Sequence, residues 1–159
     1  MIPTSRHLQY VRGYIELGMV NEASDELEVI EWDDRLKPEV LATRAELYLA
    51  AKNWELMEAV SRGLATDQPG IPQGWVHWAY ALREQQKVKD AKEVALKGLE
   101  RHPDEAILHF NLACYHSLLG EFPAAKKHLN RAIKLDERFK VGAVEDDDLV
   151  GMWDSFGDG

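Results

Sequence analysis

Residues 109–136 read HFNLACYHSLLGEFPAAKKHLNRAIKLD, and this stretch decides the fold. Its apolar residues recur three and four positions apart on both sides of Gly120, which is the pattern of two amphipathic helices. Glycine readily adopts the left-handed conformation that ends a helix, and Pro123 suits the first turn of the helix that follows. The stretch therefore predicts a helix, a short turn at Gly120 and a second helix that folds back on the first.

The same pattern returns every 34 residues along most of the chain. Four rows that start at Thr4, Pro38, Pro72 and Ala106 align without a gap, and the fourth closes at Phe139. Small or adaptable residues occupy the eighth and twentieth positions of the rows: Val11, Ala45, Ala79 and Ala113, then Ala23, Met57, Ala91 and Ala125. Small residues at a helix crossing let two helices approach closely. Each row therefore predicts one helix pair, and the rows together predict an all-α solenoid.

This unit resembles the tetratricopeptide repeat (TPR) family, whose helix-turn-helix repeat has the same length and the same small and aromatic positions. Residues 109–136 are the nearest match in the chain, and row one has Tyr14, Gly18, Ala23 and Leu27 in the family's places. The resemblance implies a right-handed superhelix of four repeats at 4–37, 38–71, 72–105 and 106–139. We expect a repeat domain over residues 1–140, a helix cap at Asp104, and an acidic tail over 141–159 that is similar to tails of small bacterial members.

In this family the first helices line a concave groove, which positions 2, 5, 9, 12 and 13 of each row face. By resemblance the main groove residues are Leu8, Arg12, Ile15, Ala42, Glu46, Leu49, Val76, Tyr80, Arg83, Ile107, Phe110, Cys114 and Leu118, with Glu39, Gln73 and Ser117 beside them. Many of these are apolar at positions that the repeat core does not need, and exposed apolar surface usually marks a binding site. We expect a peptide or an amphipathic helix to bind there. The alternative is that these residues pack against neighbouring rows.

One well-known ligand site of the family is absent from the sequence. Family members that bind acidic chaperone C-termini carry Lys at position 5 and Asn at position 9 of one row, whereas row one has Leu8 and Arg12. Asn111 stands at a clamp position of row four without a lysine partner. We therefore predict no carboxylate clamp.

The charge of the chain is unevenly distributed. The net charge is −9, and six acidic residues follow the last basic residue, Lys140, which leaves −3 for residues 1–140. Such a body has no strong basic field, so we expect no nucleic-acid partner. The basic run Lys126, Lys127, Arg131 and Lys134 is interpreted as a solvated helix face. A single cysteine, no apolar leader and no membrane-length apolar run favour the cytoplasm.

Chemistry-bearing motifs are missing as well. His109 and His116 lie two turns apart on one helix, about 10 Å, which is too far for one metal ion to bind both directly. Cys114 and His116 are near neighbours on a helix and point to different faces, so they form no dyad. No phosphate loop, nucleophile motif or zinc spacing is present. We predict no enzyme activity, no cofactor and no metal.

The tail carries its own helical pattern. Leu149, Met152, Trp153 and Phe156 follow the i, i+3, i+4, i+7 rule, and the acids before them suit a helix N-terminus. Three alternatives stay open: a cap over row four, insertion into a groove of the same or another molecule, and a disordered end favoured by the glycines.

Three functions follow from this fold. The leading hypothesis is an adaptor that binds a peptide or helix of another protein. The second is a chaperone-like holder of a hydrophobic client, and the third is a self-associating module, for which a homo-oligomer is possible. Fold alone does not name the partner.

Overall fold

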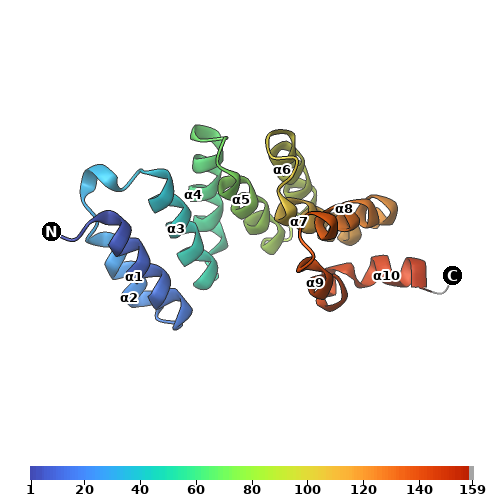
Figure 1. The fold of residues 1–159 in the computed structure, drawn as a ribbon, viewed down its shortest axis with the longest axis horizontal. Coiled ribbons are helices and arrows are strands. Elements are labelled where there is room, and N and C mark those ends of the chain that lie inside the picture. The colour runs from blue at the N-terminus through green and yellow to red at the C-terminus, as the bar shows by residue number, and fades with distance from the viewer. Residues whose placement is uncertain (158–159) are drawn as a thin grey trace. The chain divides into compact units, whose positions relative to one another are not determined.

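The computed structural model describes residues 1–157, which form helices joined by short turns (Figure 1). The four rows correspond to α1 Thr4–Glu16, α2 Val20–Glu28, α3 Pro38–Ala50, α4 Trp54–Asp67, α5 Pro72–Glu84, α6 Val88–Arg101, α7 Ala106–Leu118 and α8 Phe122–Leu135. Each first helix begins at the first position of its row and ends at the thirteenth, and each second helix begins at the seventeenth. The all-α class predicted from the 34-residue period is confirmed.

The turn inside each row has the same backbone conformation four times. The fifteenth residue is left-handed in every row, with φ of 74° at Gly18, 55° at Lys52, 66° at Gln86 and 76° at Gly120. The next residue's N–H then donates to the carbonyl oxygen five positions back, as Glu121 does to His116 at 2.9 Å. This bond satisfies one of the free carbonyls at the helix end. The turn predicted at Gly18 and Gly120 is confirmed, and two non-glycine residues adopt it as well.

The chain divides into two compact units, Met1–Ala81 and Leu82–Gly159, called here the N-terminal unit and the C-terminal unit. The core of the N-terminal unit is formed by α1, α2 and α3, and it contains Leu8, Val11, Ala23, Leu27, Ile30, Val40 and Leu47. In the C-terminal unit, α7 packs against both α6 and α8. Leu108, Leu112 and Ala113 of α7 are fully buried there.

Row one ends differently from the other rows. Its second helix stops at Glu28, and a 3-10 turn, η1 Trp32–Asp34, follows. Arg35 fixes this ending, because its guanidinium donates to the carbonyl oxygens of Glu28 at 2.6 Å and Ile30 at 3.1 Å and lies over the Trp32 ring. Row one therefore ends in a shortened second helix.

The segment after row four is also helical. It forms α9 Phe139–Glu145, η2 Asp147–Leu149 and α10 Val150–Gly157. Figure 1 shows α9 and α10 in red beside α7 and α8, and contacts join them to both helices. The expected cap at Asp104 is wrong: Glu105 is the N-cap of α7 without a side-chain bond, and Asp104 instead accepts from Arg131 at 2.8 Å.

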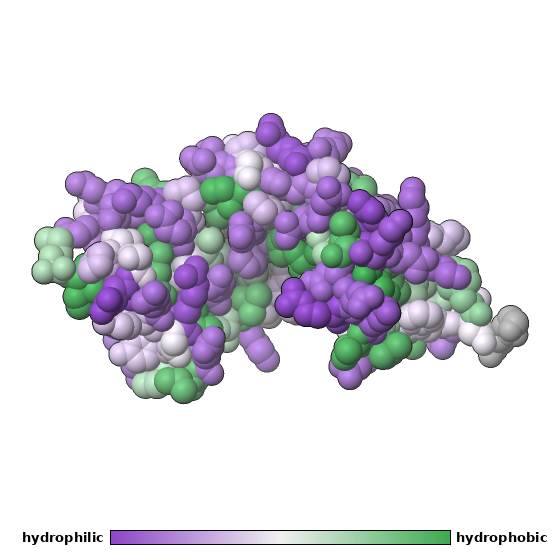
Figure 2. Space-filling model, viewed as in Figure 1, coloured by the Kyte–Doolittle hydropathy of each residue, from purple (hydrophilic) through white to green (hydrophobic). Residues whose placement is uncertain are grey.

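One face of the molecule is mostly polar. Figure 2 shows hydrophilic side chains over much of the visible face, with apolar patches between them. Within residues 1–157, no helix combines the length and the apolar character needed to cross a bilayer.

The left-handed turn residue of row two generates a stability prediction. A residue with a β-carbon costs about 1–2 kcal/mol in this conformation, and replacing it with glycine removes that cost. Glycine also increases the conformational entropy of the unfolded chain, which offsets part of the gain in stability. We expect Lys52→Gly to raise the free energy of unfolding by about 0.5–1 kcal/mol in urea titrations. Lys52→Ala keeps the β-carbon and is the control. An equal gain in both variants would contradict the account.

Candidate functional site

In the N-terminal unit, the predicted groove residues of α1 and α3 border a shallow hollow. Its volume is about 290 Å³, and its lining residues are Arg12, Pro38, Glu39, Ala42, Glu46, Ile71 and Gln73. Pro38, Glu39, Ala42 and Glu46 come from α3, Ile71 is the last residue of row two, and Gln73 lies at the start of α5 in row three. Groove positions from three successive rows thus meet around one space.

Arg12 is the central cation of this hollow. Its Nε donates to Glu46 Oε2 at 3.3 Å, and its Nη2 donates to Thr43 Oγ1 at 2.9 Å. Thr43 in turn donates to the Glu39 carbonyl oxygen at 2.8 Å. The Arg12 and Glu46 side chains remain 48% and 37% exposed, so their ion pair contributes at most about 1 kcal/mol. An exposed pair of this kind can exchange one partner for a ligand group at low cost.

The apolar groove residues of this unit differ in exposure. Leu8 lies in the core, because α1 packs directly on α3 at this position, and Ile15 packs against the same cluster. Ala42 is buried, whereas Leu49 is 37% exposed. Val76 and Tyr80 are half-buried, and the Tyr80 ring lies 6.0 Å from the Trp54 ring at 59°. Leu49 is therefore the most exposed apolar groove residue that the first two rows present.

In the C-terminal unit, the corresponding face of α7 is covered. Phe110, Cys114 and Ser117 occupy groove positions, and all three are buried. Ile107 is half-buried, and Leu118, at the end of the helix, is 42% exposed. The cover is the chain's own tail, since η2 and α10 pack on α7. The groove face of α7, defined here as Phe110, Cys114 and Ser117, thus holds a helical segment.

Apolar contacts seat the tail on this face. Leu149 and Met152 are fully buried, and the Met152 N–H donates to Ser117 Oγ at 3.3 Å. Phe139, at the start of α9, stacks on Phe110 with the ring centroids 4.9 Å apart. Of the four predicted docking residues, Leu149 and Met152 point inward, while Trp153 and Phe156 are 41% and 38% exposed.

The two outward aromatic residues still make polar contacts. Trp153 Nε1 donates to the Ala143 carbonyl oxygen at 2.6 Å, which ties α10 to α9. Lys126 of α8 places its Nζ 4.7 Å from the centre of the Phe156 ring. A cation at this distance over an aromatic face is attracted to it.

An ion pair joins the tail to α5. Arg83 donates from Nη2 to Asp148 Oδ1 at 2.7 Å and from Nε to Oδ2 at 3.0 Å, with both side chains about one fifth exposed. This hydrogen-bonded pair raises the pKa of Arg83. Asp146 stabilises the turn by accepting from the Asp148 N–H at 2.9 Å. A bidentate, partly shielded pair of this kind fixes direction as well as distance.

Cys114 lies next to these acids. Its sulfur and single oxygens of Asp146 and Asp148 all lie within 4.8 Å of one another. Burial, with the nearby Asp146 and Asp148 charges, raises the pKa of the Cys114 thiol. The thiol therefore stays protonated at neutral pH and is a poor nucleophile. Both Asp148 oxygens already accept hydrogen bonds from Arg83, so this cluster is explained as part of the tail contact.

Three histidines stack in the C-terminal unit, and sequence reasoning found only two of them. His128 of α8 lies between His109 and His116 of α7, with ring centroids 5.3 and 5.4 Å away. His109 Nε2 is held by the Pro103 carbonyl oxygen at 2.7 Å, and its Nδ1 lies 3.1 Å from His128 Nδ1. The repeat register could have identified His128, because α8, the second helix of row four, packs on the face of α7 that carries His109 and His116.

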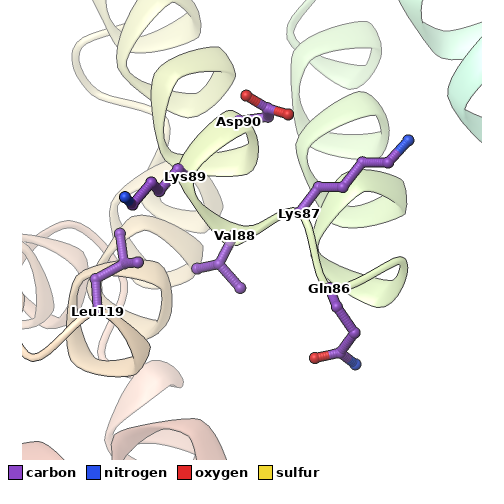
Figure 3. A pocket seen from close by; sticks show the side chains of 6 residues that line it. All are labelled: Gln86, Lys87, Val88, Lys89, Asp90 and Leu119. Atoms are coloured by element: carbon purple, nitrogen blue, oxygen red, sulfur yellow. The ribbon is translucent and has the colours of Figure 1, made fainter.

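Two further hollows lie in the C-terminal unit outside the groove residues. One, of about 510 Å³, is lined by His109, Lys127, His128, Asn130, Arg131 and Lys134 and includes most of the basic run. The other, of about 490 Å³, lies at the turn between α5 and α6 and is drawn in Figure 3. Leu119, at the C-terminal end of α7, also lines it. Figure 3 shows Asp90 and Lys87 pointing away from Leu119.

Comparison with known proteins adds the fold family. No protein-family model and no curated protein matches the chain. Among solved structures, the thermophilic TPR protein TTC0263 of Thermus thermophilus is 20% identical, with a TM-score of 0.79 over 96% of this chain and 82% of that one. MamA MSR-1 is 20% identical, with a TM-score of 0.67 over 86% and 79% of the two chains.

A third similar structure belongs to a complex. The APC/C hetero-tetramer Cut9-Hcn1 contains a chain that is 15% identical, with a TM-score of 0.66 over 94% of this chain and 30% of that one. At these identities the similarity shows the fold. The chain therefore has the fold of tetratricopeptide-repeat proteins, as its 34-residue period predicted.

The tail contact generates a second stability prediction. Because Met152 is fully buried, Met152→Ala should lower the free energy of unfolding by about 2–4 kcal/mol. Val150→Ala, at a half-exposed position of the same helix, should change it by less than about 1 kcal/mol. Urea unfolding followed by tryptophan fluorescence measures both. Equal, small losses would show that the tail contributes little to folding.

The histidine stack generates a pH prediction. Burial, followed by the charges of His109, His116 and Lys127, lowers the pKa of His128 from 6.5 to about 4. Between these two pKa values, a falling pH protonates His128 in the unfolded chain but not in the folded chain, so the free energy of unfolding decreases. Since His128 is only partly buried, solvent screens part of this effect, and we expect about 1 kcal/mol of loss between about pH 7 and pH 5.

The measurement is urea unfolding of the wild type and of His128→Gln at both pH values. The two proteins differ only at position 128, so the difference between the two losses reports the contribution of that position. The variant should lose less stability than the wild type. Equal losses would show that His128 is protonated as easily in the folded chain as in the unfolded one.

Proposed function

We propose that this protein is a protein-binding module that takes up a segment of a partner along the groove face of its first helices. The observation that carries the proposal is a contrast between equivalent positions. In the C-terminal unit, groove residues such as Cys114 are buried under a helical segment, whereas in the N-terminal unit Arg12, Glu46 and Leu49 remain open to solvent. A surface with the same repeat pattern thus holds an amphipathic segment in one unit and presents solvent-exposed side chains in the other.

The chemistry of the open face suits a peptide or helix. Leu49 and the hollow beside Ala42 provide apolar area, and Arg12, Glu46 and Gln73 provide charge and hydrogen-bonding groups around it. Apolar contact supplies binding energy, and the polar groups fix the orientation of the bound chain. The similar chain in Cut9-Hcn1 is part of a hetero-tetramer, and this supports a protein as the partner.

Two other functions use the same surface. A chaperone-like holder would keep one aggregation-prone client on the apolar groove residues, and a self-associating module would place one chain's tail or groove on another. Light scattering over a range of concentrations tests the latter, because a constant monomer mass would exclude it.

The test of the adaptor function is a quantitative pull-down from lysate with two matched variants. Leu49→Glu places a charge on the groove face, and Leu56→Glu places the same charge on α4, outside it, at a residue of similar exposure. We expect a protein captured by the wild type and by Leu56→Glu, and reduced at least about tenfold with Leu49→Glu, which corresponds to about 1.4 kcal/mol. Circular dichroism verifies that both variants fold. Identical capture by all three proteins would reject the groove as the binding site.

A further inference from the structure

We infer that the tail is a stand-in for the partner, and that the groove face of α7 binds an acidic amphipathic segment of another protein in the tail's place. The segment required has an aspartate that pairs with Arg83, an apolar residue one position later and another four positions later. Asp148, Leu149 and Met152 have this spacing in the chain itself. The inference rests on the proposed function and names the chemistry of its ligand.

The charged contact selects an acidic ligand. Arg83 meets Asp148 with two hydrogen bonds of 2.7 and 3.0 Å, and the Arg83 side chain is only 19% exposed. One carboxylate therefore accepts from two nitrogens of the same guanidinium. Without a carboxylate at this point, a partly shielded guanidinium would lose both of these hydrogen bonds, so an occupant that lacks an acid is disfavoured.

The apolar contact sets the spacing. Leu149 directly follows the aspartate, and Met152 lies one helical turn further on, so both side chains reach the same face. Both are fully buried in contact with the α7 side of the unit, and the Met152 backbone is held by Ser117 Oγ. The face of α7 therefore recognises one charge and two apolar side chains at fixed distances.

The tail segment on this face is short, and one side of its helix is exposed. It meets the face through a 3-10 turn and a helix of eight residues, and Val150, Trp153 and Phe156 of that helix remain 38–50% exposed. Gly157 lowers the helix propensity of the segment, and a side chain at its position would meet no neighbouring atom within 4 Å. A partner helix with the same three anchors and a stronger helix sequence would bury equivalent area at a smaller ordering cost, so at sufficient concentration it competes with the tethered tail.

The experiment adds the tail to the full-length protein as a separate peptide. A fluorescein-labelled peptide of residues 139–157 is titrated with the wild type, Asp148→Asn and Arg83→Ala, and fluorescence anisotropy reports binding. Asp148→Asn weakens the internal tail contact but keeps Arg83, so it should bind the peptide at least about tenfold more tightly than the wild type does. Arg83→Ala breaks the same ion pair but removes the cation that the peptide needs, so it should bind weakly.

A second peptide that carries Asp148→Asn serves as the charge control and should bind weakly to all three proteins. The inference is overturned if Asp148→Asn binds no more tightly than the wild type, or if Arg83→Ala binds as tightly as Asp148→Asn. It is also overturned if the two peptides bind equally.

Failure of this inference is separable from failure of the proposed function. The peptide titration tests binding to the groove face of α7 in the C-terminal unit. The Leu49→Glu pull-down tests binding to the groove of the N-terminal unit. Groove-dependent capture without peptide binding would reject only the tail-like ligand. Peptide binding without groove-dependent capture would reject only the N-terminal groove as the partner site.

Discussion

The structure depends on the close approach of two helices within each row. At the eighth and twentieth positions, all eight residues are at most 1% exposed, and six of them are alanine. Short side chains there allow the helix axes to come together, and the left-handed residue between the helices sets the path of the chain. Lys52 and Gln86 adopt this strained conformation without the help of glycine. The packing of rows two and three therefore offsets a backbone cost of about 1–2 kcal/mol at each turn.

Helix positions could be predicted from the sequence because they depend on local, repeated signals. The same register predicts every first helix, whether or not its row has a good turn residue. Features set by single contacts could not be predicted. Asp104 resembles a helix cap in sequence, but in the structure its carboxylate accepts a hydrogen bond from Arg131. Likewise α2 is short because Arg35 occupies the carbonyls at its end, and no periodic pattern contains that information.

The resemblance to the family predicts which way the residue at each groove position faces, but it does not predict whether that residue is exposed to solvent. Leu8 and Leu49 both face the groove side by position, yet Leu8 packs into the core and Leu49 stays exposed. The tail glycines were interpreted as opposing a helix, whereas two of them permit close packing. A β-carbon at Gly142 would lie 3.1 Å from Phe110 Cζ, and one at Gly151 would lie 3.3 Å from Phe122 Cε1. Such close approaches join residues far apart in sequence, so a single chain read alone does not reveal them.

Under the proposed binding mode, the surface that covers the last repeat is also the surface that binds a ligand. A solenoid must cover the apolar face of its last row, and here the cover lies on groove residues of α7 and not only on α8. Burial of Leu149 and Met152 contributes roughly 1.5–3 kcal/mol each to that cover, against the entropy of ordering the tail. A ligand that enters this face must first displace the tail, so its apparent affinity is reduced by the fraction of molecules in which the face is open. The Arg83–Asp148 pair therefore helps to hold the tail on this face, and under the proposed binding mode it contributes to the threshold for binding there.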